Sequence, residues 1–146
     1  MMHPFMAQGV LGAIGRISLL PHPGSTSRAE EARRGDVVLI TSNRTNLPLS
    51  PGAFPDAARA GVYALVRSLA IDCAADGITV KAIAPNFQYS EAYYPKSFFV
   101  ESQAGRDYVQ ANVPVGRLAQ PWEIGEVIAF LATAKNRFLT GAVIDL

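Results

Sequence analysis

The sequence predicts an α/β domain, with a short parallel β-sheet and flanking helices. Two continuous runs of apolar, largely β-branched residues, DVVLIT at 36–41 and ITVKAIA at 78–84, have the composition of strands buried on both faces. An amphipathic helical pattern at 56–76 lies between these runs, and a third strand-like run occupies 142–146. Strands that alternate with helices in this order are typical of a parallel sheet with right-handed crossovers.

Composition limits the classes of function that the sequence supports. Of 146 residues, 49% are hydrophobic and 17% are charged, and the formal net charge is +1. This balance gives no electrostatic reason to expect nucleic acid or an anionic membrane as a partner. No run of eighteen apolar residues is present, so we expect no membrane span and a cytoplasmic protein. We also expect no metal site, because His3 and His22 lack the paired spacing of metal ligands.

The N-terminal part is predicted to contain a packed helix over 5–20. Bulky and small residues alternate there, and Gly9, Gly12 and Gly15 would let another helix approach closely. Each glycine lowers helix propensity by roughly 1 kcal/mol relative to alanine. Residues 21–35 are polar and rich in turn formers, which predicts a surface connection to the first strand.

The helix predicted at 56–76 has two distinct faces. Large apolar side chains recur at the spacing of one helical face, and small residues form a second face that would admit another helix. Gly77 follows, at a position where glycine commonly ends a helix. The apolar face comprises positions 58, 62, 65, 66, 69 and 73, and the small-residue face comprises Ala57, Ala60, Gly61 and Ala64.

Two further segments follow the second strand. Residues 87–112 are unusually aromatic and are predicted to form a long loop or a broken helix. Pro121 and Glu123 then open another helix, because proline suits the first turn and an acidic residue there faces the positive end of the helix dipole. The predicted apolar side of this helix carries Ile124, Val127, Ile128, Phe130 and Leu131.

The order of these elements and four motifs resemble the short-chain dehydrogenase/reductase superfamily over nearly the whole chain. The motifs are ITS at 40–42, Arg59 on the long helix, AIAPN at 82–86, and PVGRLAQPWEIGEVIAFLAT at 114–133 with LTG at 139–141. The resemblance implies that residues 1–146 form a single partial domain, with the last three strands of a larger Rossmann-like sheet. The glycine-rich nucleotide-binding half is absent, because no strand precedes the weakly similar spacing of Gly9, Gly12 and Gly15. We therefore expect no bound cofactor.

Within the superfamily, the sequence resembles the halohydrin dehalogenases more closely. It has arginine rather than lysine at the catalytic cation position, Arg59, and PNFQYSEAYYP at 85–95 where typical dehydrogenases have a Pro-Gly segment. The resemblance implies a haloalcohol or an epoxide as the substrate. It also implies a substrate and halide pocket, although the same residues would serve equally to cap the strand and cover the core. The pocket residues are Pro85, Asn86, Phe87, Tyr93 and Tyr94.

The dehalogenase scheme needs a serine, a tyrosine and an arginine. In the family, the serine and tyrosine hydroxyls bind the substrate oxygen, and the arginine favours the tyrosine phenolate, which removes the hydroxyl proton. Ser42 and Arg59 match two of these positions. The tyrosine should lie thirteen residues after Ser42 and four before Arg59, and both counts end at Pro55. Proline has no ionisable group, and Tyr63 lies two helical turns away from the expected position.

The sequence therefore predicts a degenerate protein of this kind, with weak or no activity. Two alternatives stay open: an NAD(P)-dependent short-chain oxidoreductase that takes its cofactor half from elsewhere, and a non-catalytic dimerising subunit. Ser42 would also suit a plain turn and Pro55 a helix start. Arg59 would then be an exposed arginine or one paired with Asp56. The small-residue face of helix 56–76 resembles the dimer surface of the superfamily, so we expect a homo-oligomer through that helix.

Overall fold

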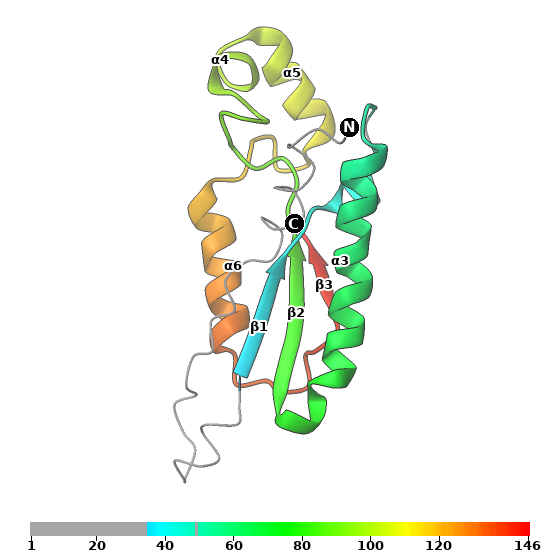
Figure 1. Ribbon diagram of the computed structural model, residues 1–146. Helices are drawn as coiled ribbons and strands as arrows, with labels where there is room; N and C mark the ends of the chain where they lie inside the picture. The colour runs from blue at the N-terminus through cyan, green and yellow to red at the C-terminus, as the bar shows by residue number, and fades with distance from the viewer. Residues whose placement is uncertain (1–34, 49) are drawn as a thin grey trace. The chain divides into compact units, whose positions relative to one another are not determined.

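A computed structural model describes residues 35–48 and 50–146 of the chain (Figure 1). The helix predicted over 5–20, and all but the last residue of the connection after it, lie outside these residues. The chain forms two compact units, each described by itself. The first contains the residues up to Pro85 together with Ile128–Leu146, and the second is Asn86–Val127.

The first unit contains a parallel sheet of three strands in the order β1-β2-β3. These strands are β1 (Gly35–Ile40), β2 (Ile78–Ala84) and β3 (Val143–Asp145). The predicted α/β fold with a partial Rossmann-like sheet is therefore confirmed. The bounds of β2 agree with the sequence prediction, whereas β1 begins and ends one residue earlier and β3 is shorter by one residue at each end.

Helix α3 (Ala53–Asp72) connects β1 to β2 and begins three residues before the predicted start. It extends back past Pro55 because the first turn of a helix needs no backbone N–H from proline. The Asp56 N–H donates to the Gly52 carbonyl over 2.8 Å. A short 3₁₀ turn, η2 (Ala74–Asp76), follows the helix. The long helix was predicted to end at Asp76 before Gly77, but α3 ends at Asp72, and Gly77 ends η2 in the left-handed conformation at φ = 67°.

One face of the sheet packs against α3. Val62, Val66 and Ala70 lie one helical turn apart and contact a buried cluster from β1 and β2 that includes Leu39 and Val80. The predicted apolar face was too wide, because Leu65 is 40% exposed and position 58 is exposed as well. A flat sheet contacts only the central row of a helix, so the flanking positions of the apolar stripe stay in solvent.

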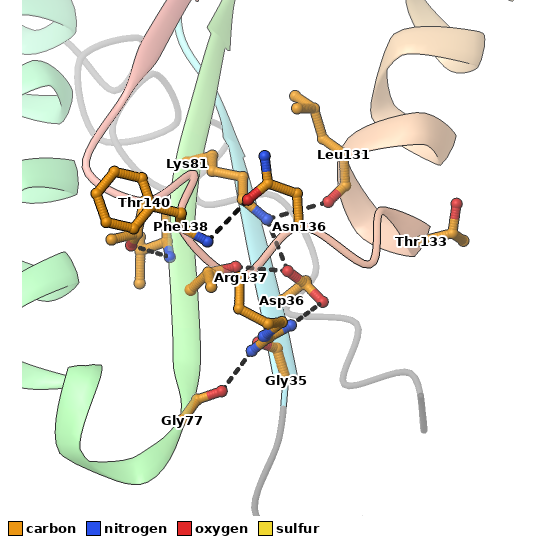
Figure 2. A network of polar contacts seen from close by, with 12 residues as sticks. Gly35, Asp36, Gly77, Lys81, Leu131, Thr133, Asn136, Arg137, Phe138 and Thr140 are labelled. Carbon is orange, nitrogen blue, oxygen red and sulfur yellow. Dashed lines mark hydrogen bonds and ion pairs between the residues drawn. The ribbon is translucent and has the colours of Figure 1, made fainter. Parts of the chain in front are cut away.

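The other face of the sheet carries a buried ionic cluster at the amino ends of β1 and β2, which Figure 2 shows. Lys81 is fully buried, and its ammonium donates to Asp36 Oδ1 over 2.6 Å and to the Leu131 carbonyl over 3.2 Å. Arg137 Nη1 donates to Asp36 Oδ2 over 2.9 Å, and the Thr79 hydroxyl donates to Asp36 Oδ1. Each oxygen of this one carboxylate therefore has a cationic donor, which is the condition under which a buried charge is tolerated.

The Asp36 cluster also ties the last part of the chain to the sheet. Leu131 belongs to α6 (Pro121–Thr133), and Arg137 lies in the segment between α6 and β3. Arg137 Nη2 donates to the carbonyls of Gly35 and Gly77. Gly35 is the first residue of β1, and Gly77 directly precedes β2. The segment that leads into β3 is thus held by direct contacts to the beginnings of β1 and β2.

Helix α6 confirms the predicted start at Pro121 but corrects part of its apolar side. Ile124 and Leu131 are buried, whereas Phe130 is 64% exposed. Each residue turns the helix by roughly 100°, so Phe130 lies well off the row that contains Ile124 and Leu131. The prediction for Phe130 was wrong because hydrophobicity alone does not set the width of a buried helical face. In the described residues, no helix is both long and apolar enough to cross a membrane.

The second unit confirms the broken helix predicted for the aromatic segment. Its helices are α4 (Lys96–Phe99) and α5 (Gln103–Asn112), and the Ser102 hydroxyl caps α5 by accepting from the Gly105 N–H over 3.0 Å. A Cβ on Gly105 would lie 1.9 Å from the Phe98 carbonyl oxygen, so only glycine fits between the two helices. The core of the unit joins Val109, Val113 and Leu118 to Phe87, Tyr89, Tyr94 and Phe99.

Asp36→Asn should destabilise the protein and flatten its pH dependence. Burial alone would raise the pKa of Asp36, but hydrogen bonds from Lys81 and Thr79 and the charges of Lys81 and Arg137 hold that pKa below its usual value. A lowered folded-state pKa gives stability that is present above the unfolded value and lost as pH falls through the folded one. We expect the substitution to lower the free energy of unfolding at pH 7 by about 3 kcal/mol.

Urea unfolding from pH 7 down to pH 3 measures both effects. The difference between the parent and Asp36→Asn should narrow as the carboxyl group of the parent becomes protonated. Asp76→Asn, at an exposed acid in η2, is the control and should change stability little. An Asp36→Asn protein as stable as this control at pH 7 would show that the buried cluster does not stabilise the fold.

Candidate functional site

Ser42 lies two residues beyond the end of β1 and begins a short 3₁₀ turn, η1 (Asn43–Thr45). Its hydroxyl oxygen accepts a hydrogen bond from the Arg44 N–H over 3.4 Å. Ser42 therefore has the local role of a turn cap, which agrees with the alternative interpretation of Ser42 as a plain turn residue. A hydroxyl has two lone pairs and one proton, so accepting this bond leaves its proton available for another acceptor.

Two contacts bring the Ser42 segment against the beginning of α3. The Thr41 hydroxyl donates to the Arg59 carbonyl over 3.1 Å, and Arg44 Nε donates to Asp56 Oδ1 over 3.0 Å. Ser42 lies between these two anchored residues in the chain. It is therefore held close to the first two turns of α3, which carry Pro55 and Arg59.

Pro55 occupies the third position of α3 and is exposed. It lines a shallow, open depression together with Pro48, Pro51, Phe54 and Asp56. Neither Pro55 nor Phe54 carries a hydroxyl group, so neither can accept or relay a proton there. The position that the family resemblance gives to a tyrosine is thus present as a place in the fold but lacks the ionisable group.

Tyr63 does not point its hydroxyl at this position. The hydroxyl donates to Asp145 Oδ1 over 3.1 Å, at the end of β3. Burial raises the pKa of Tyr63, the hydrogen bond to Asp145 and its negative charge raise that pKa further, and only the contact with Thr45 lowers it. Tyr63 is therefore held as a neutral phenol, which is the wrong protonation state for a general base.

The predicted pocket residues fall mainly in the second unit. Asn86 Oδ1 accepts from the Phe87 N–H and from the Tyr94 hydroxyl, each over 2.9 Å. Phe87 has φ = 46°, a left-handed conformation that is uncommon for an aromatic residue and often marks a functional segment. The Phe87 and Tyr94 rings lie 5.8 Å apart, whereas Tyr93 is 72% exposed. Asn86, Phe87 and Tyr94 are thus brought together, and Tyr93 is not part of their bonded group.

Pro85 is buried and directly follows β2. It is the last residue of the first unit before the chain enters the second. Ser42, Pro55 and Arg59 belong to that unit, and the Asn86 group belongs to the other. Each has internal contacts that fix its own geometry.

The described residues contain neither a glycine-rich dinucleotide phosphate motif nor a group of side chains that could hold a metal ion. A dinucleotide phosphate site needs a strand, a glycine-rich turn and a helix N-terminus in succession. Within 35–48 and 50–146, β1 is followed by Thr41 and Ser42, and β2 by Pro85 and Asn86. No group of three or more His, Cys, Asp or Glu side chains in these ranges could hold a metal. Gly9, Gly12 and Gly15 lie outside them.

Comparison with known proteins identifies the family. The family model described as enoyl-(acyl carrier protein) reductase matches residues 25–146. The chain belongs to the short-chain dehydrogenase/reductase superfamily. The matched range contains every motif on which the resemblance rested.

The similar curated proteins are oxidoreductases. The chain is 41% identical over 113 residues to the cis-4-hydroxycyclohexanecarboxylate dehydrogenase of Sinomonas cyclohexanicum, a match covering 77% of the chain and 43% of the relative. It is 34% identical over 119 residues to an uncharacterized oxidoreductase of Caenorhabditis elegans, covering 81% of the chain and 38% of the relative. The chain therefore spans less than half the length of these two relatives.

Similar solved structures include a halohydrin dehalogenase bound to ethyl (2S)-oxiran-2-ylacetate. The TM-score is 0.73 at 31% identity, over 82% of this chain and 49% of that protein. A structure described as a dehalogenation enzyme aligns with a TM-score of 0.72 at 29% identity, over 80% of this chain and 48% of that protein. The similarity to the dehalogenase branch, which Arg59 and the 85–95 segment suggested, is thus also found in three dimensions.

The sequence analysis missed two polar contacts around the Ser42 turn. Arg44 pairs with Asp56, and Asn46 Nδ2 donates to Asp145 Oδ2 over 2.9 Å. Arg44 and Asp56 lie 12 positions apart in the sequence, and Asn46 and Asp145 lie 99 positions apart. No local periodicity connects residues at such separations, so only the tertiary structure reveals them.

Tyr63→Phe should remove a phenol that ionises unusually late. In an absorbance titration of tyrosine ionisation, the difference between the parent and Tyr63→Phe should show a transition above pH 10, because burial and Asp145 both raise the pKa of Tyr63. Asp145→Asn should shift this transition to lower pH. A Tyr63 transition below pH 10 in the parent would contradict the neutral phenol and reopen Tyr63 as a proton acceptor.

Proposed function

We propose that this chain is a degenerate member of the superfamily that resembles halohydrin dehalogenases. It binds a small haloalcohol or epoxide and turns it over weakly or not at all. The observation that carries the proposal is the pair of contacts that joins the Ser42 segment to the first turns of α3, beside Pro55. The neighbours of Ser42, Thr41 and Arg44, bond to the helical turns that carry Pro55 and Arg59, which supports a site with a serine and a cation but without the proton acceptor.

The missing group is decisive for the chemistry. Epoxide formation requires that the substrate hydroxyl lose its proton, that its oxygen bond to the adjacent carbon, and that halide leave with the electrons of the broken carbon–halogen bond. Ser42 can donate its proton to the substrate oxygen, and Arg59 supplies a permanent positive charge. Neither accepts a proton at neutral pH, so deprotonation is left to solvent. Positioned general bases contribute rate factors of roughly 10² to 10⁴, and this factor is lost.

The substrate and halide pocket is assigned to Pro85, Asn86, Phe87, Tyr93 and Tyr94. The Asn86 side chain fixes the Phe87 amide and the Tyr94 ring relative to each other, which supports a preformed apolar wall. A halide that used the Phe87 N–H would have to compete with Asn86 Oδ1 for it.

Pro55→Tyr should restore halide release from a 1,3-dichloropropanol-type substrate. The substituted tyrosine would lie one helical turn from Arg59, whose charge favours the phenolate. We expect an increase on the order of 100-fold over the parent, the lower range of general base catalysis. Halide release is measured directly in solution.

Pro55→Phe is the matched control, because it supplies the ring without the hydroxyl and should release no more halide than the parent. Ser42→Ala or Arg59→Ala, introduced into Pro55→Tyr, should abolish the gain, since such residues act as a unit. Strong halide release by the unmodified protein would overturn the degenerate assignment. No gain from Pro55→Tyr would contradict the proposed function, because the missing tyrosine would then not explain the lack of activity.

The names of the curated relatives favour a second candidate, a nicotinamide-dependent oxidoreductase. The two relatives described above are a dehydrogenase and an oxidoreductase. That chemistry uses the same tyrosine to move a proton while the nicotinamide moves hydride, so Pro55 opposes it equally. Titration of the protein with NADPH, followed by nucleotide fluorescence, separates the two candidates: saturable tight binding would favour the oxidoreductase.

We also propose that the protein forms a homo-oligomer through α3. Ala57, Ala60, Gly61 and Ala64 are exposed, and a Cβ added at Gly61 would meet no atom within 4 Å. Large apolar residues flank this strip, with Phe54 73% exposed and Ile71 77% exposed. A helix face with small residues at its centre and apolar residues around them suits packing against a second copy of itself.

Ala64→Arg should dissociate this oligomer, because it places a long charged side chain in the centre of the small-residue face. Sedimentation velocity should then change from an oligomeric to a monomeric species. Ala111→Arg makes the same substitution at an exposed position of α5 and should leave the oligomer intact. A monomeric parent, or an Ala64→Arg protein that sediments like its parent, would contradict the α3 interface. An intact oligomer that never releases halide, even with Pro55→Tyr, would favour the non-catalytic subunit.

A further inference from the structure

The turn that begins at Ser42 is anchored by an acidic side chain on α3. The Ser42 hydroxyl accepts from the backbone N–H of Arg44, and the guanidinium of Arg44 donates to Asp56 Oδ1. Asp56 thus connects to Ser42 through a single intermediate residue. This connection crosses from the loop after β1 to the first turn of α3, beside Pro55.

The Arg44–Asp56 pair is better placed than an ordinary surface ion pair. The two side chains are 25% and 16% exposed, and the nitrogen–oxygen distance is 3.0 Å. Partial burial reduces screening by water and salt, so such a pair contributes more than a fully exposed one. The turn that it anchors is short, and a three-residue 3₁₀ turn has little stability of its own. The position of Ser42 therefore depends on contacts made by its neighbours.

A second acidic side chain anchors the same turn from the other direction. Asn46, which caps η1, donates from Nδ2 to Asp145 Oδ2 over 2.9 Å. Asp145 Oδ1 accepts from the Tyr63 hydroxyl over 3.1 Å, so the carboxylate is fixed by α3 as well. The Ser42 turn is thus tied at Arg44 to the start of α3 and at Asn46 to the end of β3. These residues all belong to the first unit.

We propose that Asp56 is a positioning residue, which holds the Ser42 hydroxyl in place through Arg44, with Asp145 as the second anchor of the turn. The proposal rests on the proposed function, because it gives Ser42 a substrate to bind. Asp56 touches neither the substrate nor the reacting atoms. Its effect is to keep the serine preorganised at a site where an error of about 1 Å costs rate on the order of 100-fold.

A purely local role for Asp56 makes a different prediction. An acidic residue in the first turn also stabilises a helix through its dipole, without any partner. In that case Asp56→Asn would weaken α3, and Arg44→Met, which leaves Asp56 in place, would have no effect on Ser42. In the positioning role, both substitutions release the same turn, and combining them adds little to either alone.

The kinetic test uses Pro55→Tyr as the parent. Asp56→Asn and Arg44→Met should each lower kcat for halide release on the order of tenfold and change KM less than about twofold, because the serine is misplaced while the binding pocket stays. The double substitution should be no slower than the slower single one. Asp72→Asn, which neutralises an acid in the last turn of the same helix, is the matched control and should leave kcat unchanged. Full kcat in Asp56→Asn would overturn the proposal.

Amide hydrogen exchange in the unmodified protein tests the anchor without any activity. Asp56→Asn should increase exchange in the Ser42–Asn46 turn on the order of tenfold, and Asp72→Asn should not. Asp145→Asn should loosen the same turn from the Asn46 side. Unchanged exchange in Asp56→Asn would overturn the proposal even if kcat falls. If Pro55→Tyr releases no halide, the proposed function fails, and the exchange result alone then decides whether Asp56 holds the turn.

Discussion

Parallel pairing of β1 with β2 requires the chain to return to the end of the sheet where β1 begins before it can form the second strand. Helix α3 makes this return, and Val62, Val66 and Ala70 pack it onto the strands that it connects. The same crossover fixes where chemistry can occur. Because α3 starts beside the carboxyl end of β1, its first two turns lie next to the residues that follow this strand. The neighbours of Ser42 therefore contact the turns that carry Pro55 and Arg59, as Thr41 and Arg44 do.

The two ends of the sheet are stabilised by different physical means. At the amino ends of β1 and β2, Asp36 is buried with Lys81 and Arg137, where a missing partner would leave an uncompensated charge. At the carboxyl ends, the Arg44–Asp56 and Asn46–Asp145 contacts are more exposed and individually weaker. Loss of a partner is therefore expected to cost more stability in the buried cluster than in the contacts near Ser42. This division leaves the Ser42 end free to change chemically at little cost in stability.

Pro55 illustrates that separation between fold and chemistry. Proline is well suited to the first turn of α3, because its fixed φ favours the helix and its missing N–H is not needed. Under the proposed function, proline at this position deprives the site of its ionisable group without weakening the helix that carries the site. Ser42 caps its turn and Arg59 lies on α3, so the proposed site keeps these two positions without a proton acceptor. A fold and the chemistry of a site on it can vary independently, which is the condition that the proposed function requires.

The sequence by itself determined the class of fold, the three parallel strands, the long crossover helix, and the coincidence of two residue counts at Pro55. These follow from short-range periodicity and motif spacing, which act within a few residues. Only the tertiary structure decided that Phe130 and Leu65 are exposed, that Tyr63 bonds to Asp145, and that Asp56 reaches Ser42 through Arg44. The width of a buried face depends on what packs against it. Contacts between residues 12 to 99 positions apart depend on the folded path of the chain. Local sequence therefore encodes neither the width of a buried face nor these contacts.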